Sequence, residues 1–271
     1  MSQGCDRAKA VRIVSASPEF VLDVIRANHR HQCSVDPEAE PDVALSFDTT
    51  VTEWRDACNL LGTKKLAEAL NEDWGVAILP AEWKDALEPS KSRTLRDVCE
   101  LIASQATRTD VLSVGHFGTS SKAAGAFLAI RSVLLRAGAD AATIRPSLPI
   151  ADVARRFPSV LLGPISKLAP DRLPTVAIRT PAYDAAVTVS GVGFLGLLGL
   201  TVAGWLGLTR WRTELGLLFA IALGLGFFWT WIAGRFVGPA EVRFGTIVTF
   251  RDLAEAIAGE RTYPLDDTGR P

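Results

Sequence analysis

The sequence predicts a mainly helical protein in which small helical bundles are joined to a two-helix transmembrane hairpin. Three observations support this fold class. Two apolar runs without charged residues lie close together in the second half of the chain, several amphipathic segments begin at capping residues, and one ten-residue segment occurs twice. The mean hydropathy is positive although 22% of the residues are charged, so the apolar residues must be concentrated in part of the chain.

The two apolar runs have the length of membrane-spanning helices. Residues 185–208 include no charged residue, and at about 1.5 Å per residue they give a helix of roughly 36 Å, enough to cross a bilayer. Residues 215–233 give roughly 28 Å, which is close to the minimum for a crossing. Because only residues 209–214 separate the runs, we expect an antiparallel helical hairpin in contact with the lipid bilayer.

The charges around the hairpin predict its orientation. Basic residues are more frequent outside the hairpin than in its turn, which favours a cytoplasmic location for both termini. The N-terminus lacks the apolar core of a signal peptide, in agreement with this orientation. We therefore expect a multi-pass protein of the inner (cytoplasmic) membrane. The basic residues are Arg172, Arg179, Arg235, Arg243 and Arg251 outside the hairpin, and Arg210 and Arg212, next to Glu214, in the turn.

Small residues recur at a spacing of four in both runs. Such stripes let helix backbones approach closely in lipid, so they could pack the hairpin or join two copies into a homo-oligomer, although glycine is also simply frequent in membrane helices. The stripes are Gly199, Ala203 and Gly207 in the first run and Gly216, Ala220 and Gly224 in the second. Trp211 at the turn, with Trp229 and Trp231 at the other end, predicts aromatic anchoring at both membrane interfaces.

Neither run contains an ionisable residue, which argues against a transporter or pump and favours an anchor or oligomerisation element. The net charge of −1 and the absence of a basic block argue against a nucleic-acid partner. The four cysteines form no CxxC pair and indicate a reduced compartment.

The rest of the chain divides by composition. Residues 1–110 are expected to form a helical domain, and residues 111–163 a second helical segment whose strong helix is capped at Ser120 or Ser121. Residues 164–184 contain four prolines within 18 residues and are interpreted as an extended linker. Residues 234–271 form a cytoplasmic C-terminal segment with one amphipathic helix.

One segment is repeated. "TLRDVCELIA" at 94–103 and "TFRDLAEAIA" at 249–258 are identical at six of ten positions. Both begin with Thr-x-x-Asp, which is typical of a capping box, and both place their apolar residues on one helical face. The shared register indicates an internal repeat rather than two unrelated helices.

These segments resemble the acyl and peptidyl carrier protein family. The repeat is similar to the last helix of a carrier, "NLLGTKKLAEALNEDWGVAI" at 59–78 is similar to its second helix, and "FLAIRSVLLRAGADAATIRPSLPIAD" at 127–152 is similar to its first helix and following loop. The resemblance implies two carrier-like helical bundles, one over about 18–104 and one starting near 121 and ending at 249–258, with the hairpin inserted.

The resemblance also identifies a missing group. A carrier attaches phosphopantetheine to a serine at the start of its second helix, and Leu60 occupies that position here. "GHFGTSSKAAG" faintly resembles the peptidyl-carrier attachment motif, which would make Ser120 the attachment site, but Ser121 stands where leucine is usual. The resemblance therefore implies degenerate carrier-like domains, with modification at Ser120 as the alternative.

Other catalytic or metal chemistry has little support. His29, His31 and Cys33 are not accompanied by a second pair of ligands, so no metal site is expected. An enzyme could be assembled from His116 with Cys58 or Ser120, although no spacing favours it. The resulting hypothesis is a membrane-anchored, non-catalytic docking or scaffold protein whose partners, by resemblance, are enzymes of acyl or polyketide assembly.

Overall fold

The computed structural model describes residues 10–34, 36, 38–116, 119–170, 172–174, 176–179, 181–205, 213–236 and 241–260. The described chain is mainly helical, as expected. It divides into two compact units. One comprises Met1–Ala177 together with Arg243–Pro271, called here the helical unit, and the other comprises Ile178–Val242, called here the hairpin unit.

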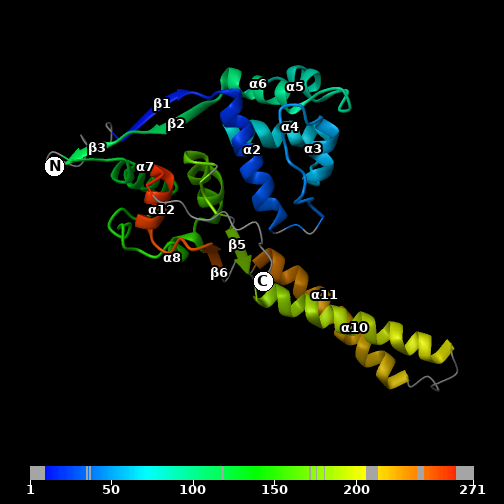
Figure 1. Ribbon diagram of the computed structural model, residues 1–271. Helices are drawn as coiled ribbons and strands as arrows, with labels where there is room; N and C mark the ends of the chain where they lie inside the picture. Colours follow the sequence, from blue (N-terminus) through cyan, green and yellow to red (C-terminus); the bar gives the residue numbers. More distant parts are fainter. Residues whose placement is uncertain are drawn as a thin grey trace. The chain divides into compact units, whose positions relative to one another are not determined.

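The helical unit begins with a bundle closed by a strand pair (Figure 1). Strand β1 (Val11–Ser15) pairs antiparallel with β2 (Thr107–Val111), which joins the two ends of this bundle. The sequence had not indicated these strands. Between them lie α2 (Pro18–Cys33), α3 (Val51–Ala57), α4 (Thr63–Trp74), α5 (Pro80–Leu87) and α6 (Leu95–Gln105).

The helices of this bundle enclose an apolar core. Helix α6 presents Leu95, Val98 and Ile102 to it with no measurable exposure, and Trp83 from α5 is also fully buried. The spacing of three and four residues in α6 places these side chains on one face, which explains why this helix packs against α2. Helix α4 ends at Gly75, whose φ of +61° terminates the helix without strain.

The rest of the helical unit starts with a short strand pair, β3 (Val114–His116) and β4 (Thr119–Ser121). Helix α7 (Lys122–Arg136) follows and packs against α12 (Phe250–Ala258), near the C-terminus. The C-terminal helix thus belongs to the same compact unit as residues 1–163. The remaining elements of this unit are α8 (Ile150–Ala154), α9 (Pro158–Val160), η1 (Leu161–Ile165) and η2 (Ser166–Leu168). The boundary between the two units falls within two paired strands, β5 (Val176–Arg179) and β6 (Glu241–Phe244).

The predicted internal repeat is present in the backbone. The Thr94 and Thr249 backbone N–H groups each donate to the aspartate three residues later, at 2.9 Å in both cases. The next residue of each segment also repeats its bond, because Leu95 N–H donates to Thr49 O and Phe250 N–H donates to Leu148 O. Isolated bridges occur at equivalent places, Thr50 with Thr94 and Pro149 with Thr249. Helices α3 and α6 therefore correspond to α8 and α12. Helix α2 packs against α6 as α7 packs against α12, so α2 and α7 occupy equivalent places.

The expectation of an extended linker over residues 164–184 is wrong for its first part. Pro164 lies inside the helical turn η1, and Ile165, Ser166 and Ala169 that surround it are buried. The apolar side chains of this stretch pack into the helical unit, and this burial outweighs the tendency of proline to keep a chain extended.

The hairpin unit contains α10 (Pro181–Trp205) and α11 (Thr213–Phe236), which lie side by side (Figure 1). Gly193 lies against Leu223 and Gly226 lies against Ser190, so the two helices run antiparallel. Within the described residues, the segment Ala185–Trp205 is the one helix long and apolar enough to cross a membrane, and Gly216–Ile232 is a shorter apolar helix. A second crossing is therefore not established by length.

Candidate functional site

The hairpin packs through different glycines from those expected. A Cβ added at Gly226 would lie 2.3 Å from Ser190 Oγ and 2.7 Å from Ser190 N, and one at Gly193 would lie 2.6 Å from Leu223 N. A Cβ at Gly196 would meet the Phe219 ring at 2.3 Å. Close approach of the helices therefore depends on these glycines.

Four of the five described residues of the predicted stripes lie away from the contact between the helices. A Cβ at Gly199, Gly216 or Gly224 would have no neighbour within 4 Å, and Ala220 is exposed while Ala203 is half-buried. Gly207 lies outside the described residues. The contact face of α10 instead alternates steps of four and three residues, which keeps it on one side of a helix with 3.6 residues per turn. Residues spaced constantly by four, as in the predicted stripes, shift gradually around the helix and leave this face. The buried or half-buried residues of the described part of α10 are Ala186, Ser190, Gly193, Gly196, Leu197, Leu200, Ala203 and Gly204.

The outer surface of the hairpin is apolar. Large side chains on both helices are about half exposed or more, among them Phe194 at 57%, Leu195 at 65% and Leu218 at 62%. Of the predicted interface anchors, Trp229 and Trp231 are exposed, and Trp211 lies outside the described residues. Such a surface would be costly in water, and it matches the chemistry of lipid.

The structure places the candidate attachment positions on the helical unit. Helix α4 begins at Thr63, so Leu60 precedes it, and Leu60 packs partly against the bundle core. Ser120 is exposed in β4 opposite Gly115, while Ser121 caps α7 by accepting a hydrogen bond from Ala124 N–H at 3.1 Å. Ser121 is thus the capping residue. Ser120 is on the surface, and its hydroxyl forms no hydrogen bond with another described residue.

The proposed catalytic cysteine is poorly suited to nucleophilic chemistry. Cys58 ends α3 inside the bundle core, and its burial, followed by the nearby Cys33 thiol, raises its pKa to about 12. A thiolate is the reactive form, and it is scarce at neutral pH for such a group. The backbone of His116 lies in β3, and its side chain lies outside the described part of the chain.

The histidines of α2 are structural. His29 is 6% exposed and its Nε2 lies 3.0 Å from the Glu40 carbonyl oxygen. Desolvation lowers the pKa of His29, and desolvation followed by the charge of Arg30 lowers that of His31 to about 4. Among the residues that the structure describes, no group of three or more His, Cys, Asp or Glu side chains could hold a metal ion.

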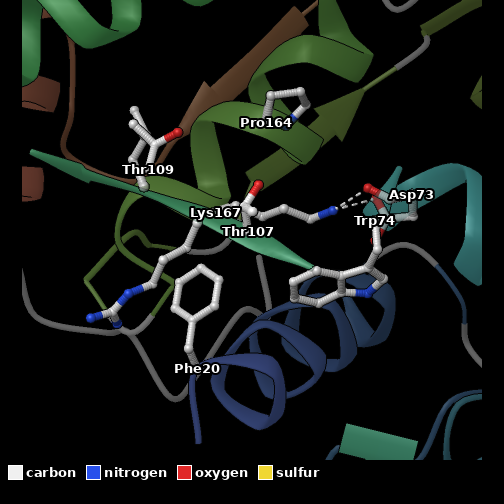
Figure 2. A pocket seen from close by; sticks show the side chains of 9 residues that line it. Phe20, Asp73, Trp74, Thr107, Thr109, Pro164 and Lys167 are labelled. Carbon is white, nitrogen blue, oxygen red and sulfur yellow. Dashed lines mark hydrogen bonds and ion pairs between the residues drawn. The ribbon is translucent and has the colours of Figure 1, made fainter. Parts of the chain in front are cut away.

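A cavity that sequence reasoning missed lies in the helical unit (Figure 2). It has a volume of about 170 Å³ and is partly open to solvent. Residues far apart in the sequence form it, since α2, α4, β2 and the η1–η2 segment each contribute, and no local motif marks them. The lining residues are Phe20, Asp73, Trp74, Thr107, Arg108, Thr109, Pro164, Lys167 and Leu168.

Aromatic rings and cations organise this cavity. Phe20 and Trp74 meet edge to face, with ring centroids 6.2 Å apart. The Lys167 ammonium lies 4.5 Å from the centre of the Trp74 ring, and the Arg108 guanidinium lies 5.4 Å from the centre of the Phe20 ring. Figure 2 shows Lys167 extending past Trp74 to Asp73, with which it forms an ion pair of 2.8 Å. This arrangement fixes the charged groups at the cavity wall.

Comparison of the chain with protein-family models, with curated proteins and with solved structures finds no match.

Proposed function

We propose that this protein is a membrane-anchored docking protein, in which the hairpin inserts into the bilayer and the helical unit recruits partners. The observation that carries the proposal is the outer surface of α10 and α11. Among the residues that the structure describes, sixteen of the twenty large apolar side chains with high exposure are on these two helices, and 185–205 and 215–233 contain no charged residue. Only lipid or other protein would cover such a surface favourably.

Two crossings are proposed from the pairing of the helices. Helix α11 has 24 residues, a length of about 36 Å, although its apolar part is shorter. Because α11 packs along α10 with opposite direction, an inserted α10 carries α11 into the same layer. The turn between them would then lie outside the cytoplasm and both termini inside, as the basic residues around the hairpin suggest.

The docking role is proposed for the helical unit from its resemblance to carrier proteins. The bundle lacks a hydroxyl at Leu60, which packs partly against the core, and Cys58 nearby is a buried thiol. A domain of this shape without an attachment group would hold partners rather than substrates. By resemblance, those partners would be enzymes of acyl or polyketide assembly.

The alternative is a working carrier that bears phosphopantetheine at Ser120. This alternative is supported by the exposure of Ser120, which directly precedes Ser121, the N-cap residue of α7. The internal repeat weakens this alternative, because α7 corresponds to α2, the first helix of its bundle, whereas a carrier is modified at the start of its second helix.

The anchor is tested by alkaline carbonate extraction of membranes that contain the full chain. We expect the wild type to remain in the membrane pellet and the double variant Leu195→Glu, Leu218→Glu to be released, because each glutamate would place a charge on the lipid-facing surface. The matched control is Leu79→Glu, which changes a leucine of 63% exposure in the helical unit and should remain in the pellet. Extraction of the wild-type chain would reject the anchor.

A further inference from the structure

The cavity of the helical unit holds two cations whose surroundings differ. Lys167 is paired with Asp73 at 2.8 Å, and its side chain is only 18% exposed. Arg108 is exposed, and no carboxylate of the described residues lies within ion-pair distance of it. The positive charge of Arg108 is thus the one at this cavity that is not balanced by an acid.

A comparison within the same bundle makes this difference informative. Arg96 stacks over Phe47 at 4.7 Å, in the same manner as Arg108 over Phe20, but Arg96 also has Asp48 at 3.5 Å. An arginine of this bundle can therefore stack on an aromatic ring and pair with a carboxylate at the same time, and Arg108 lacks the second interaction. Arg108 is held by Phe20 with its hydrogen-bonding edge free for a ligand.

Polar and apolar groups surround Arg108 in a way that suits a small organic acid. Thr107 and Thr109 precede and follow it on β2, so their side chains point to the opposite face of the strand and leave Arg108 as the polar group beside the Phe20 ring. Trp74, Pro164 and Leu168 add apolar surface to the wall. An acid group at Arg108, with an apolar body beside the apolar lining residues, would satisfy both kinds of surface.

We infer that this cavity binds a small monocarboxylate with an apolar or aromatic body. A planar guanidinium pairs with a carboxylate through two parallel hydrogen bonds, which favours a carboxylate over a neutral amide. A single negative charge matches the one unbalanced cation, whereas a dianion would also face the Asp73 carboxylate. An organic cation is disfavoured because Lys167 and Arg108 already lie over the aromatic rings.

The volume limits the size of this ligand. A cavity of about 170 Å³ is slightly larger than the roughly 150 Å³ apolar cavity that accommodates benzene. The cavity therefore encloses a group of about the size of one six-membered ring, and its opening to solvent leaves room for the acid group and one small substituent. A suitable probe is para-fluorobenzoate, and para-fluorobenzamide is a neutral compound of the same shape.

The test is fluorine NMR of these two probes with the full chain in lipid nanodiscs, with empty nanodiscs as the blank. We expect saturable broadening of the benzoate signal, and binding of the benzamide at least about tenfold weaker, because it lacks the charge that Arg108 recognises. Arg108→Gln should weaken benzoate binding by at least about tenfold, and the matched variant Arg96→Gln should leave it unchanged.

Several results would overturn the inference. These are no saturable binding of benzoate, equal binding of benzoate and benzamide, or benzoate binding that Arg108→Gln does not affect. If Arg108→Gln fails to fold by circular dichroism, the comparison of the two probes on the wild-type chain decides alone. The site is independent of the membrane anchor, so carbonate extraction and probe binding can fail separately.

Discussion

At the scale of single residues, the charged side chain of Lys167 has a structural role. Its ammonium contacts the Trp74 ring, the Asp73 carboxylate and the Asp73 carbonyl oxygen. Arg30 adds a second tie of this kind by donating to Pro170 O at 3.0 Å. Together these contacts fasten the 164–170 segment to the first bundle, which completes the cavity wall at Pro164 and Leu168.

Two histidines of α2, the buried His29 and the partly buried His31, predict that the helical unit loses stability in mild acid. The pKa values of His29 and His31 are lowered in the folded state, that of His31 to about 4, whereas unfolded histidine titrates near pH 6.5. Between these values the unfolded chain binds more protons than the folded chain. The free energy of unfolding is therefore fully present above about pH 6.5 and falls as the pH decreases toward about 4.

The measurement is urea unfolding of the full chain at pH 7, 6 and 5. We expect His31 to account for a loss of about 1–2 kcal/mol between pH 7 and 5. His31→Gln should flatten this dependence. The carboxylates with lowered pKa, such as Glu53 and Asp36, lose their contribution only at lower pH, so they do not interfere in this window. A midpoint that stays constant from pH 7 to 5 would contradict the prediction.

At the scale of elements, the packing of α10 on α11 should depend on Gly226 and not on Gly224. In Gly226→Leu, the Cβ atom would already lie 2.7 Å from the Ser190 nitrogen, and the rest of the side chain would need more space. The substitution must therefore push the helices apart. Gly224→Leu faces open space and should be tolerated. The pair changes the same residue type, two positions apart, on the same helix.

The measurement is the rate of copper-catalysed disulfide formation between cysteines introduced at Ala186 and Thr230, with Cys5 and Cys33 replaced by serine. These two positions are in register, since Ser190 faces Gly226 on an antiparallel partner. The rate should fall several-fold with Gly226→Leu and remain at the parent value with Gly224→Leu. A lower rate of disulfide formation with Gly224→Leu but not with Gly226→Leu would show that the small-residue stripe predicted from the sequence packs the hairpin.

The predicted elements differ in how well local sequence determined them. The capping boxes at Thr94 and Thr249 and the apolar faces behind them depend on neighbours within one turn, so the sequence predicts them correctly. The choice among hairpin glycines depends on which face of α10 meets α11. Both Gly193 and Gly199 fit a small-residue stripe, and only the partner helix distinguishes them.

At the scale of the whole molecule, the strands and the cavity could not be predicted because they depend on distant contacts. Strand β1 pairs with β2 about a hundred residues later, and neither has a clear alternation of apolar and polar residues. The cavity combines Phe20, Trp74, Arg108 and Lys167 from four separate elements. By contrast, the repeated segment revealed that α12 completes a bundle like the first one, because both copies conserve the same backbone bonds.

The last prediction concerns the whole chain and distinguishes a docking protein from a working carrier. The intact mass of the full chain should be unchanged after co-expression with a broad-specificity phosphopantetheinyl transferase. The reason is that Leu60 has no hydroxyl, and that Ser120 lies in a strand pair before the helix that corresponds to α2. A carrier protein expressed in the same cells, and fully modified there, is the required positive control. A full shift by one phosphopantetheine that is lost in Ser120→Ala, and kept in the neighbouring variant Ser121→Ala, would instead make Ser120 an attachment site and the helical unit a carrier.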